Sequence, residues 1–187
     1  HQGAPDQVAQ MLLQDVAEIG IATESLSAYE DLVTLPCYEW QHVLVLPPEH
    51  PLAGKNRLTL EDIAEYPLIT YHPSFTGRTR IDNAFAARKL QPRIALEAID
   101  SDVIKTYVRL GLGVGIVAEM AVKDDPVQDL AVRPLGPLLG MNVARVAFKR
   151  GAYLRHFVYQ FAELLSDRLS ANLVAKAMSG QFNDYEL

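Results

Sequence analysis

Apolar positions along the chain recur with two spacings, and the two spacings alternate. A spacing of three to four residues, typical of an amphipathic helix, occurs over residues 5–12, 78–89, 101–110, 154–165 and 170–178. Apolar or alternating runs, typical of strands, occur at residues 19–23, 68–71, 93–98, 114–118, 130–132 and 143–148. Strands separated by helices of about ten residues predict an α/β architecture with a largely parallel sheet.

Several local signals mark the ends of these elements. Thr59 and Asp62 have the spacing of a capping box, which predicts a short helix that Pro67 must end. Residues 31–46 hold two apolar runs separated by Pro36 and its polar neighbours, which predicts a strand, a break and a second strand. Asp100 or Ser101 caps the helix that follows.

The glycine cluster of residues 111–115, Gly-Leu-Gly-Val-Gly, follows a predicted helix and precedes a predicted strand. A phosphate-binding turn needs the opposite order, with glycines between a strand and the N-terminus of a helix. The cluster therefore predicts a helix end and a tight turn rather than a dinucleotide site.

Length and composition place the chain among ordinary globular proteins. It has 187 residues, of which 49% are hydrophobic and 21% charged. A chain of this size can bury roughly 70% of its unfolded surface, so one domain or two small lobes can fold without a metal or a disulfide. The composition therefore bounds the domain number and excludes a disordered chain.

Charge and cysteine content exclude several classes of partner. With 17 basic and 23 acidic residues the formal charge is −6, which disfavours binding of this segment to nucleic acid. Cys37 is the only cysteine, which excludes an intramolecular disulfide and favours a cytoplasmic setting. No apolar run approaches the ~20 residues of a membrane span. The start at His1 without a methionine suggests that the chain is a fragment.

Catalytic and metal-binding patterns are missing from the sequence. It has neither a G-x-S-x-G elbow nor a P-loop, and its five histidines lack the spacing of metal ligands. We therefore expect no catalytic residue, no metal and no cofactor.

The most informative polar segment is Ser74-Phe75-Thr76-Gly77, directly before a predicted helix. Its hydroxyls and backbone N–H groups suit a small anion at the positive end of the helix dipole, while the simpler interpretation is an N-cap at Thr76. Thr23 ends a predicted strand, where it faces a ligand or merely closes the strand.

Large and basic side chains near this segment allow two interpretations each. Trp40 is the only tryptophan, and it is either a packing residue or a pocket wall. The arginines and lysine at positions 78, 80, 88 and 89 fit the solvated face of a helix, although Arg78 and Arg80 lie in a first turn that an anion could use.

Four phrases carry a resemblance to a known family, and the resemblance covers essentially the whole chain. They are residues 21–24 (Ile-Ala-Thr-Glu), 35–38 (Leu-Pro-Cys-Tyr), 75–78 (Phe-Thr-Gly-Arg) and 102–115 (Asp-Val-Ile-Lys-Thr-Tyr-Val-Arg-Leu-Gly-Leu-Gly-Val-Gly). They resemble the effector-binding domain of the LysR-type transcription regulators, in particular the subgroup of cysteine-regulon activators. A sibling subgroup, which regulates the use of sulfonates and sulfate esters, shares much of this pattern.

The resemblance implies a two-lobed α/β fold like that of type 2 periplasmic binding proteins, with mixed sheets and a ligand cleft between the lobes. The first lobe would comprise residues 1–38 and lack its N-terminal part. The second lobe would comprise residues 39–139. Residues 140–187 would return to the first lobe and add the C-terminal helices.

The resemblance also implies a function in sulfur assimilation and cysteine biosynthesis. Regulators of this subgroup are cytoplasmic tetramers that bind promoter DNA through an N-terminal helix-turn-helix, which is absent from this chain. Their effectors are sulfate and the acetylserines, N-acetylserine and O-acetylserine. A transport solute-binding protein for a small oxyanion is the main alternative, and an enzyme on the same scaffold is a second one.

Residue by residue, Thr23 and Thr76 match two threonines that reach the anion, with Ser74, Phe75 and Gly77 beside Thr76. Trp40 matches a tryptophan associated with the inducer response. A further anion-binding run, Thr-His-Thr-Gln, would lie before residue 1.

Overall fold

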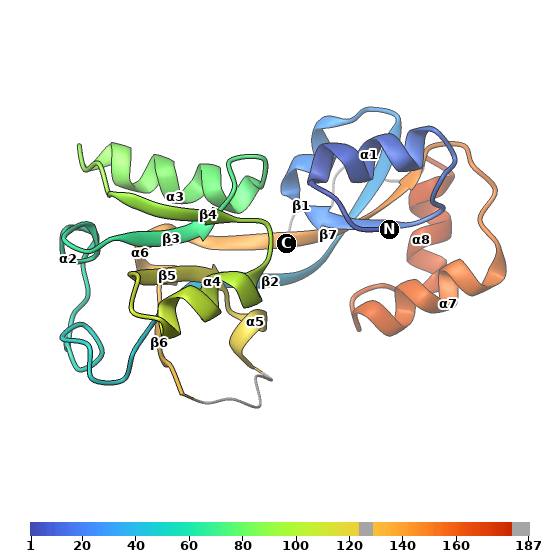
Figure 1. The fold of residues 1–187 in the computed structure, drawn as a ribbon. Helices are drawn as coiled ribbons and strands as arrows, with labels where there is room; N and C mark the ends of the chain where they lie inside the picture. The colour runs from blue at the N-terminus through green and yellow to red at the C-terminus, as the bar shows by residue number, and fades with distance from the viewer. Residues whose placement is uncertain (124–128, 181–187) are drawn as a thin grey trace. The chain divides into compact units, whose positions relative to one another are not determined.

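The computed structural model describes residues 1–123 and 129–180 (Figure 1). The chain divides into two compact units: unit 1 comprises residues 1–39 and 142–187, and unit 2 comprises residues 40–141. The boundaries expected from the sequence fall after residues 38 and 139. None of the helices in the described residues is long and apolar enough to cross a membrane.

Unit 1 is built on a sheet in which β7 (Met141–Lys149) lies between β1 (Gly20–Thr23) and the first half of β2 (Leu32–Leu46). On one face, α1 (Pro5–Leu13) and the short 3-10 helix Glu24–Ala28 cover a small core around Leu12 and Leu26. The other face packs against α7 (His156–Leu165) and α8 (Ala171–Met178), through a cluster that includes Val146 and Phe148. Successive side chains of a strand point to opposite faces, so β7 contributes alternate residues to these two cores.

In the described part of unit 2, the sheet consists of the second half of β2 and four further strands. The order is β2, β5 (Val114–Ala118), β3 (Leu68–Tyr71) and β4 (Ile94–Ala98), with β6 (Ala131–Pro134) paired to the other edge of β2. β3 is parallel to both β4 and β5.

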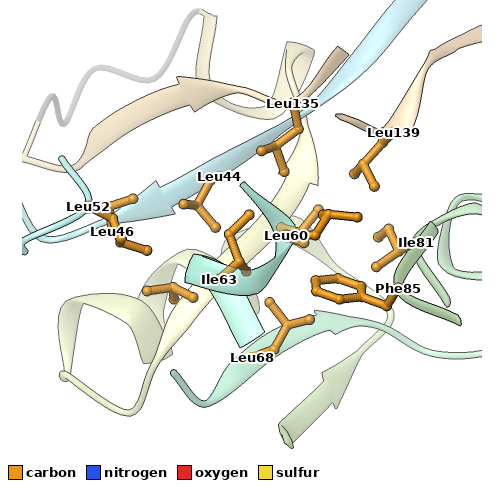
Figure 2. Close-up of a cluster of buried hydrophobic side chains, with 12 residues drawn as sticks. Leu44, Leu46, Leu52, Leu60, Ile63, Leu68, Ile81, Phe85, Leu135 and Leu139 are labelled. Atoms are coloured by element: carbon orange, nitrogen blue, oxygen red, sulfur yellow. The ribbon is translucent and has the colours of Figure 1, made fainter. Parts of the chain in front are cut away.

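Helices cover both faces of the sheet in unit 2. One face carries α2 (Leu60–Ala64), α3 (Thr76–Ala87) and α6 (Gly136–Leu139). The other carries α4 (Ser101–Arg109) and α5 (Met120–Lys123). Figure 2 shows the core beneath α3, where Ile81 and Phe85 point toward Leu60 and Leu68. This core fixes α3 on the sheet, and the start of α3 carries two of the predicted site residues, Thr76 and Gly77.

The prediction of a largely parallel sheet is wrong. β2 is antiparallel to β5 and to β6, and β1 is antiparallel to β7. The rule of right-handed, parallel crossovers applies to strands that are joined through a packed helix. In unit 2 it therefore fits the β3–α3–β4 and β4–α4–β5 connections, while the other strands are joined differently. The fold is an α/β fold with mixed strand directions, as the family resemblance implies.

The predicted break within residues 31–46 is also wrong, because β2 is continuous through Pro36. Proline has no N–H to donate to a neighbouring strand, so it is tolerated at the edge of a sheet. In the described part of unit 1, the first half of β2 lies at such an edge, beside β7.

The local end signals agree with the structure. Asp62 N donates to Thr59 Oγ1 and Thr59 N donates to Asp62 Oδ2, which completes the predicted capping box before α2. The Asp100 carboxylate accepts from Asp102 N at 2.6 Å and so caps α4.

The glycine cluster is structural, as its order predicts. Gly111 ends α4 with a φ of +75°. A Cβ at Gly113 would lie 2.2 Å from the carbonyl oxygen of Pro67, and a Cβ at Gly115 would lie 2.7 Å from a methyl group of Val45. Each of these glycines is thus required either by a turn or by the close packing of two segments of the chain.

Cys37 is buried in the core of unit 1, and burial raises the pKa of its thiol from 9.0 to about 11. We expect the folded chain to react with a chromogenic aromatic disulfide about a hundredfold more slowly than the unfolded chain near neutral pH, because only the thiolate attacks. The measurement is the rate of thiolate release with and without guanidinium chloride. Equal rates in the two states would contradict the burial of this thiol.

The raised pKa of Cys37 also predicts a pH dependence of stability. The free energy of unfolding should decrease as pH rises between 9.0 and about 11, because only the unfolded thiol ionises in this range.

Candidate functional site

The segment that precedes α3 forms the turn between β3 and α3 in unit 2. The helix begins at Thr76, and Phe75 occupies the N-cap position in extended conformation without a side-chain hydrogen bond. The predicted N-cap at Thr76 is therefore wrong. Arg78 N already donates to the carbonyl oxygen of Phe75 at 3.0 Å, which starts the helix one residue earlier than the sequence pattern indicates.

The first turn of α3 has the electrostatic character of an anion site. Its N-cap supplies no side-chain oxygen, and its first turn contains no acidic residue. The positive end of the dipole of this 12-residue helix therefore lacks the acidic side chain that often offsets it. This arrangement favours an anion near the amides of Thr76 and Gly77.

Beneath this turn lie two aromatic residues of β2. The rings of Trp40 and His42 meet edge to face with their centroids 4.9 Å apart, and both side chains are buried. A Cβ at Gly77 would lie 2.9 Å from His42 Nε2 and 3.8 Å from the Trp40 ring. Because Gly77 has no side chain, the first turn of α3 can pack directly on the two rings. Trp40 is thus a packing residue directly below the candidate anion site.

The loop before α3 is ordered by its own polar groups. His72 Nδ1 lies 2.9 Å from Ser74 Oγ and accepts from Ser74 N at 3.2 Å. The rings of Phe75 and Tyr71 are 6.1 Å apart. Ser74 itself is exposed, so its hydroxyl lies at the surface next to the helix start.

Arg78 anchors the first turn of α3 to the ends of two strands. Its Nη1 donates to the Tyr71 carbonyl oxygen at 2.9 Å and to Glu97 Oε1 at 2.7 Å, and its Nε donates to Asp82 Oδ1 at 2.8 Å. Burial lowers the pKa of Arg78, but the hydrogen bonds to Asp82 and Glu97 outweigh this effect and raise it. The prediction that Arg78 belongs to a solvated face is wrong, since its side chain is only 8% exposed.

Tyr71 closes the other side of the same strand end. Its hydroxyl lies 2.7 Å from Ser101 Oγ and accepts from Ala118 N at 3.0 Å. Burial raises the pKa of this phenol, so it stays neutral and keeps its proton for hydrogen bonding. The ends of β3 and β5 and the start of α4 are thereby joined.

Thr70 is a buried polar residue that the sequence does not single out. It is fully buried, and its hydroxyl has no hydrogen-bond partner among the described residues. Side chains alternate along β3, and Leu68 packs in the core beneath α3, so Thr70 faces α3 as well. An unsatisfied buried hydroxyl costs about 1–3 kcal/mol. Packing alone therefore does not explain why a threonine occupies this position.

Thr23 belongs to unit 1, where it ends β1 opposite Ala144. Its Oγ1 lies 3.2 Å from Ser25 Oγ. The structure thus gathers Trp40, Ser74, Phe75, Thr76 and Gly77 in unit 2 and places Thr23 in the other unit.

Sequence reasoning missed two residues at this site, His42 and Thr70, and it did not predict the burial of Arg78. A histidine or threonine within an apolar strand gives only a weak signal of burial. For Arg78, the position in the first turn of the helix was noted, but its strand partners are far away in sequence.

Comparisons with known proteins agree with this fold. Residues 1–170 match the model of a family described as the LysR substrate binding domain. In a solved structure, the cofactor-binding domain of the Cbl transcriptional regulator, the match has a TM-score of 0.88 at 44% identity and covers 95% of this chain and 78% of that one.

Two curated relatives come from Burkholderia cenocepacia. The HTH-type transcriptional regulator CysB is 53% identical over 186 residues, which cover 100% of this chain and 59% of that protein. The HTH-type transcriptional regulator SsuR is 48% identical over 176 residues, which cover 93% of this chain and 56% of that protein. The chain thus spans less than two thirds of the length of either relative.

Both relatives are named as transcriptional regulators and not as enzymes, which confirms the prediction of a non-enzymatic chain and does not favour the transport alternative. Together with the family match over residues 1–170, this establishes that the chain belongs to the LysR substrate-binding domain family.

Proposed function

We propose that this chain is the effector-sensing domain of a regulator of sulfur assimilation and cysteine biosynthesis, and that it binds a small oxyanion or an acetylserine at the start of α3. The effector is sulfate, N-acetylserine or O-acetylserine. The names of the CysB, SsuR and Cbl relatives support this assignment to the sulfur regulators. The observation that carries the site is the first turn of α3, which has neither a side-chain cap nor an acidic residue.

Each predicted residue has a role in this proposal. Thr76 and Ser74 offer hydroxyls, and Thr76 and Gly77 offer backbone amides to the anion. Phe75 and Trp40 shape the surroundings of the turn, and Trp40 reports on the packing beneath it because its ring lies against Gly77. Thr23 belongs to unit 1, and the family resemblance alone supports a part for it in anion binding.

The whole protein is proposed to be a cytoplasmic homotetramer. It would bind promoter DNA through a helix-turn-helix that precedes the effector domain. The names of the curated relatives, which call them HTH-type regulators, support this part of the proposal. The acidic charge of −6 on this chain is consistent with DNA contacts being made elsewhere.

The test is thermal unfolding with and without millimolar sulfate or N-acetylserine, on the chain preceded by the threonine-rich run that the resemblance places before residue 1. A ligand at a hundredfold excess over its Kd stabilises the native state by about 2.7 kcal/mol. Thr76→Ala should abolish most of this stabilisation. Thr79→Ala removes an exposed hydroxyl one turn further along α3 and should leave it intact.

Emission from Trp40 gives a second readout in this chain, where it is the only tryptophan. We expect a shift that saturates with the same ligand concentration as the thermal effect and that disappears in Thr76→Ala. A Thr76→Ala protein that keeps the full ligand-dependent stabilisation would show that the anion binds elsewhere.

A further inference from the structure

A hollow lies in unit 2, at the opposite end of α3 from Thr76. Its volume is about 340 Å³, and three arginines line it: Arg57, Arg88 and Arg133. Apolar side chains, among them Leu58, Pro134 and Leu138, form the rest of its wall. We call this feature the arginine hollow.

The positive charge of the arginine hollow is poorly neutralised. Arg133 donates to the carbonyl oxygens of Leu52, Ala53 and Lys55 at 2.6–2.9 Å, and these acceptors fix its guanidinium without cancelling its charge. No acidic residue is among the described residues that line the hollow. Arg57 is exposed and forms no ion pair within the described part of the chain.

Arg88 is held only loosely. Its Nη1 lies 3.4 Å from Glu61 Oε2, and the two side chains are 46% and 53% exposed. Exposed pairs of this kind contribute little to stability and exchange readily for other partners. An incoming anion can therefore take the place of Glu61 without a large energetic cost.

The end of α3 places a partial negative charge near Arg88, equivalent to about half an elementary charge. Three full positive charges outweigh it. The 12 residues of α3 span about 18 Å at 1.5 Å per residue, which separates the arginine hollow from the turn at Thr76. The two features are thus distinct places on one unit.

We propose that the arginine hollow binds a small organic oxyanion, with its phosphate or carboxylate group held by Arg57 and Arg88 and its apolar part packed on Leu58, Pro134 and Leu138. Guanidinium groups match the two oxygens of such an anion with paired N–H donors. The apolar wall adds affinity for a ligand that carries a hydrocarbon group. Arg133 positions the wall by holding the loop of residues 52–55.

The test is a titration of the chain with phenyl phosphate, phenylacetate, inorganic phosphate and phenol, followed by calorimetry and by NMR shifts of the arginine side chains. Phenyl phosphate or phenylacetate should bind saturably and more tightly than inorganic phosphate or phenol. The double variant R57Q/R88Q should weaken this binding by at least about tenfold, which corresponds to the loss of a charged hydrogen bond. Arg93→Gln removes an exposed charge of the same unit outside the hollow and should leave binding unchanged.

The Thr76→Ala variant separates this proposal from the site at the start of α3. Binding to the arginine hollow should persist in Thr76→Ala, while the sulfate response proposed above is lost. Three results would overturn the proposal: no saturable binding of either organic anion, equal binding by wild type and R57Q/R88Q, or loss of binding in Thr76→Ala alone.

Discussion

Replacing Arg78 with glutamine is expected to lower the free energy of unfolding by about 2–3 kcal/mol and to weaken the ligand response at the start of α3. Removing one partner of a buried ion pair costs about 3–5 kcal/mol. Here the guanidinium is buried but Asp82 and Glu97 are 48% and 37% exposed, so water compensates them in part. The substitution also releases the bond to the Tyr71 carbonyl oxygen that fixes the first turn of α3.

Chemical denaturation measures this loss, and Arg155→Gln is the matched control. Arg155 lies 2.6 Å from Glu18, but the two side chains are 60% and 39% exposed. Its loss should cost less than about 1 kcal/mol, because solvent replaces the partner. Equal effects of the two substitutions would mean that burial does not strengthen the ion pairs of Arg78.

Replacing Gly113 with alanine is expected to destabilise unit 2 by about 3 kcal/mol or more, at the upper end of the range for overpacking. The new Cβ would lie 2.2 Å from the Pro67 carbonyl oxygen and 2.9 Å from its carbon, so the backbone itself must move. The same carbonyl accepts from Val114 N at 2.9 Å, and this bond tethers the start of β5. For a chain of this size the melting temperature should decrease by about 6–12 °C.

Two other glycines of unit 2 give graded controls for this prediction. At Gly54 a Cβ meets nothing within 4 Å, so alanine should be close to neutral. At Gly111 the space is also open, but φ is +75°, so alanine should cost about 1 kcal/mol through backbone strain alone. A Gly113→Ala protein as stable as Gly54→Ala would show that the chain yields easily at Pro67.

Local patterns predicted most of the elements of this fold. The strands of residues 68–71 and 114–118 have the expected bounds, and the capping box of Thr59 and Asp62 is present. These features depend on neighbours within a few residues, which a single sequence contains. Strand direction depends on the path of the connecting chain, which local patterns do not reveal. The antiparallel pairing of β1 and of β2 was therefore not predicted.

The candidate site shows the same division between local and distant causes. A hydroxyl and a glycine before a helix indicated the turn at Thr76, because helix ends have local signatures. The burial of Arg78 could not be predicted in this way, since Glu97 is 19 residues away and the two meet only after β3 and β4 pair. The open hydroxyl of Thr70 is equally invisible, because it follows from the absence of a partner in three dimensions.

The burial of Cys37 also makes the chain convenient for site-specific labelling. Its thiol is buried and its pKa is raised to about 11, so it should react only slowly with maleimides under mild conditions. A cysteine introduced at exposed Thr79, one turn further along α3 than Thr76, would then be the only reactive thiol of the folded chain. A fluorophore attached there would follow events at the start of α3 without any change to the core of unit 1.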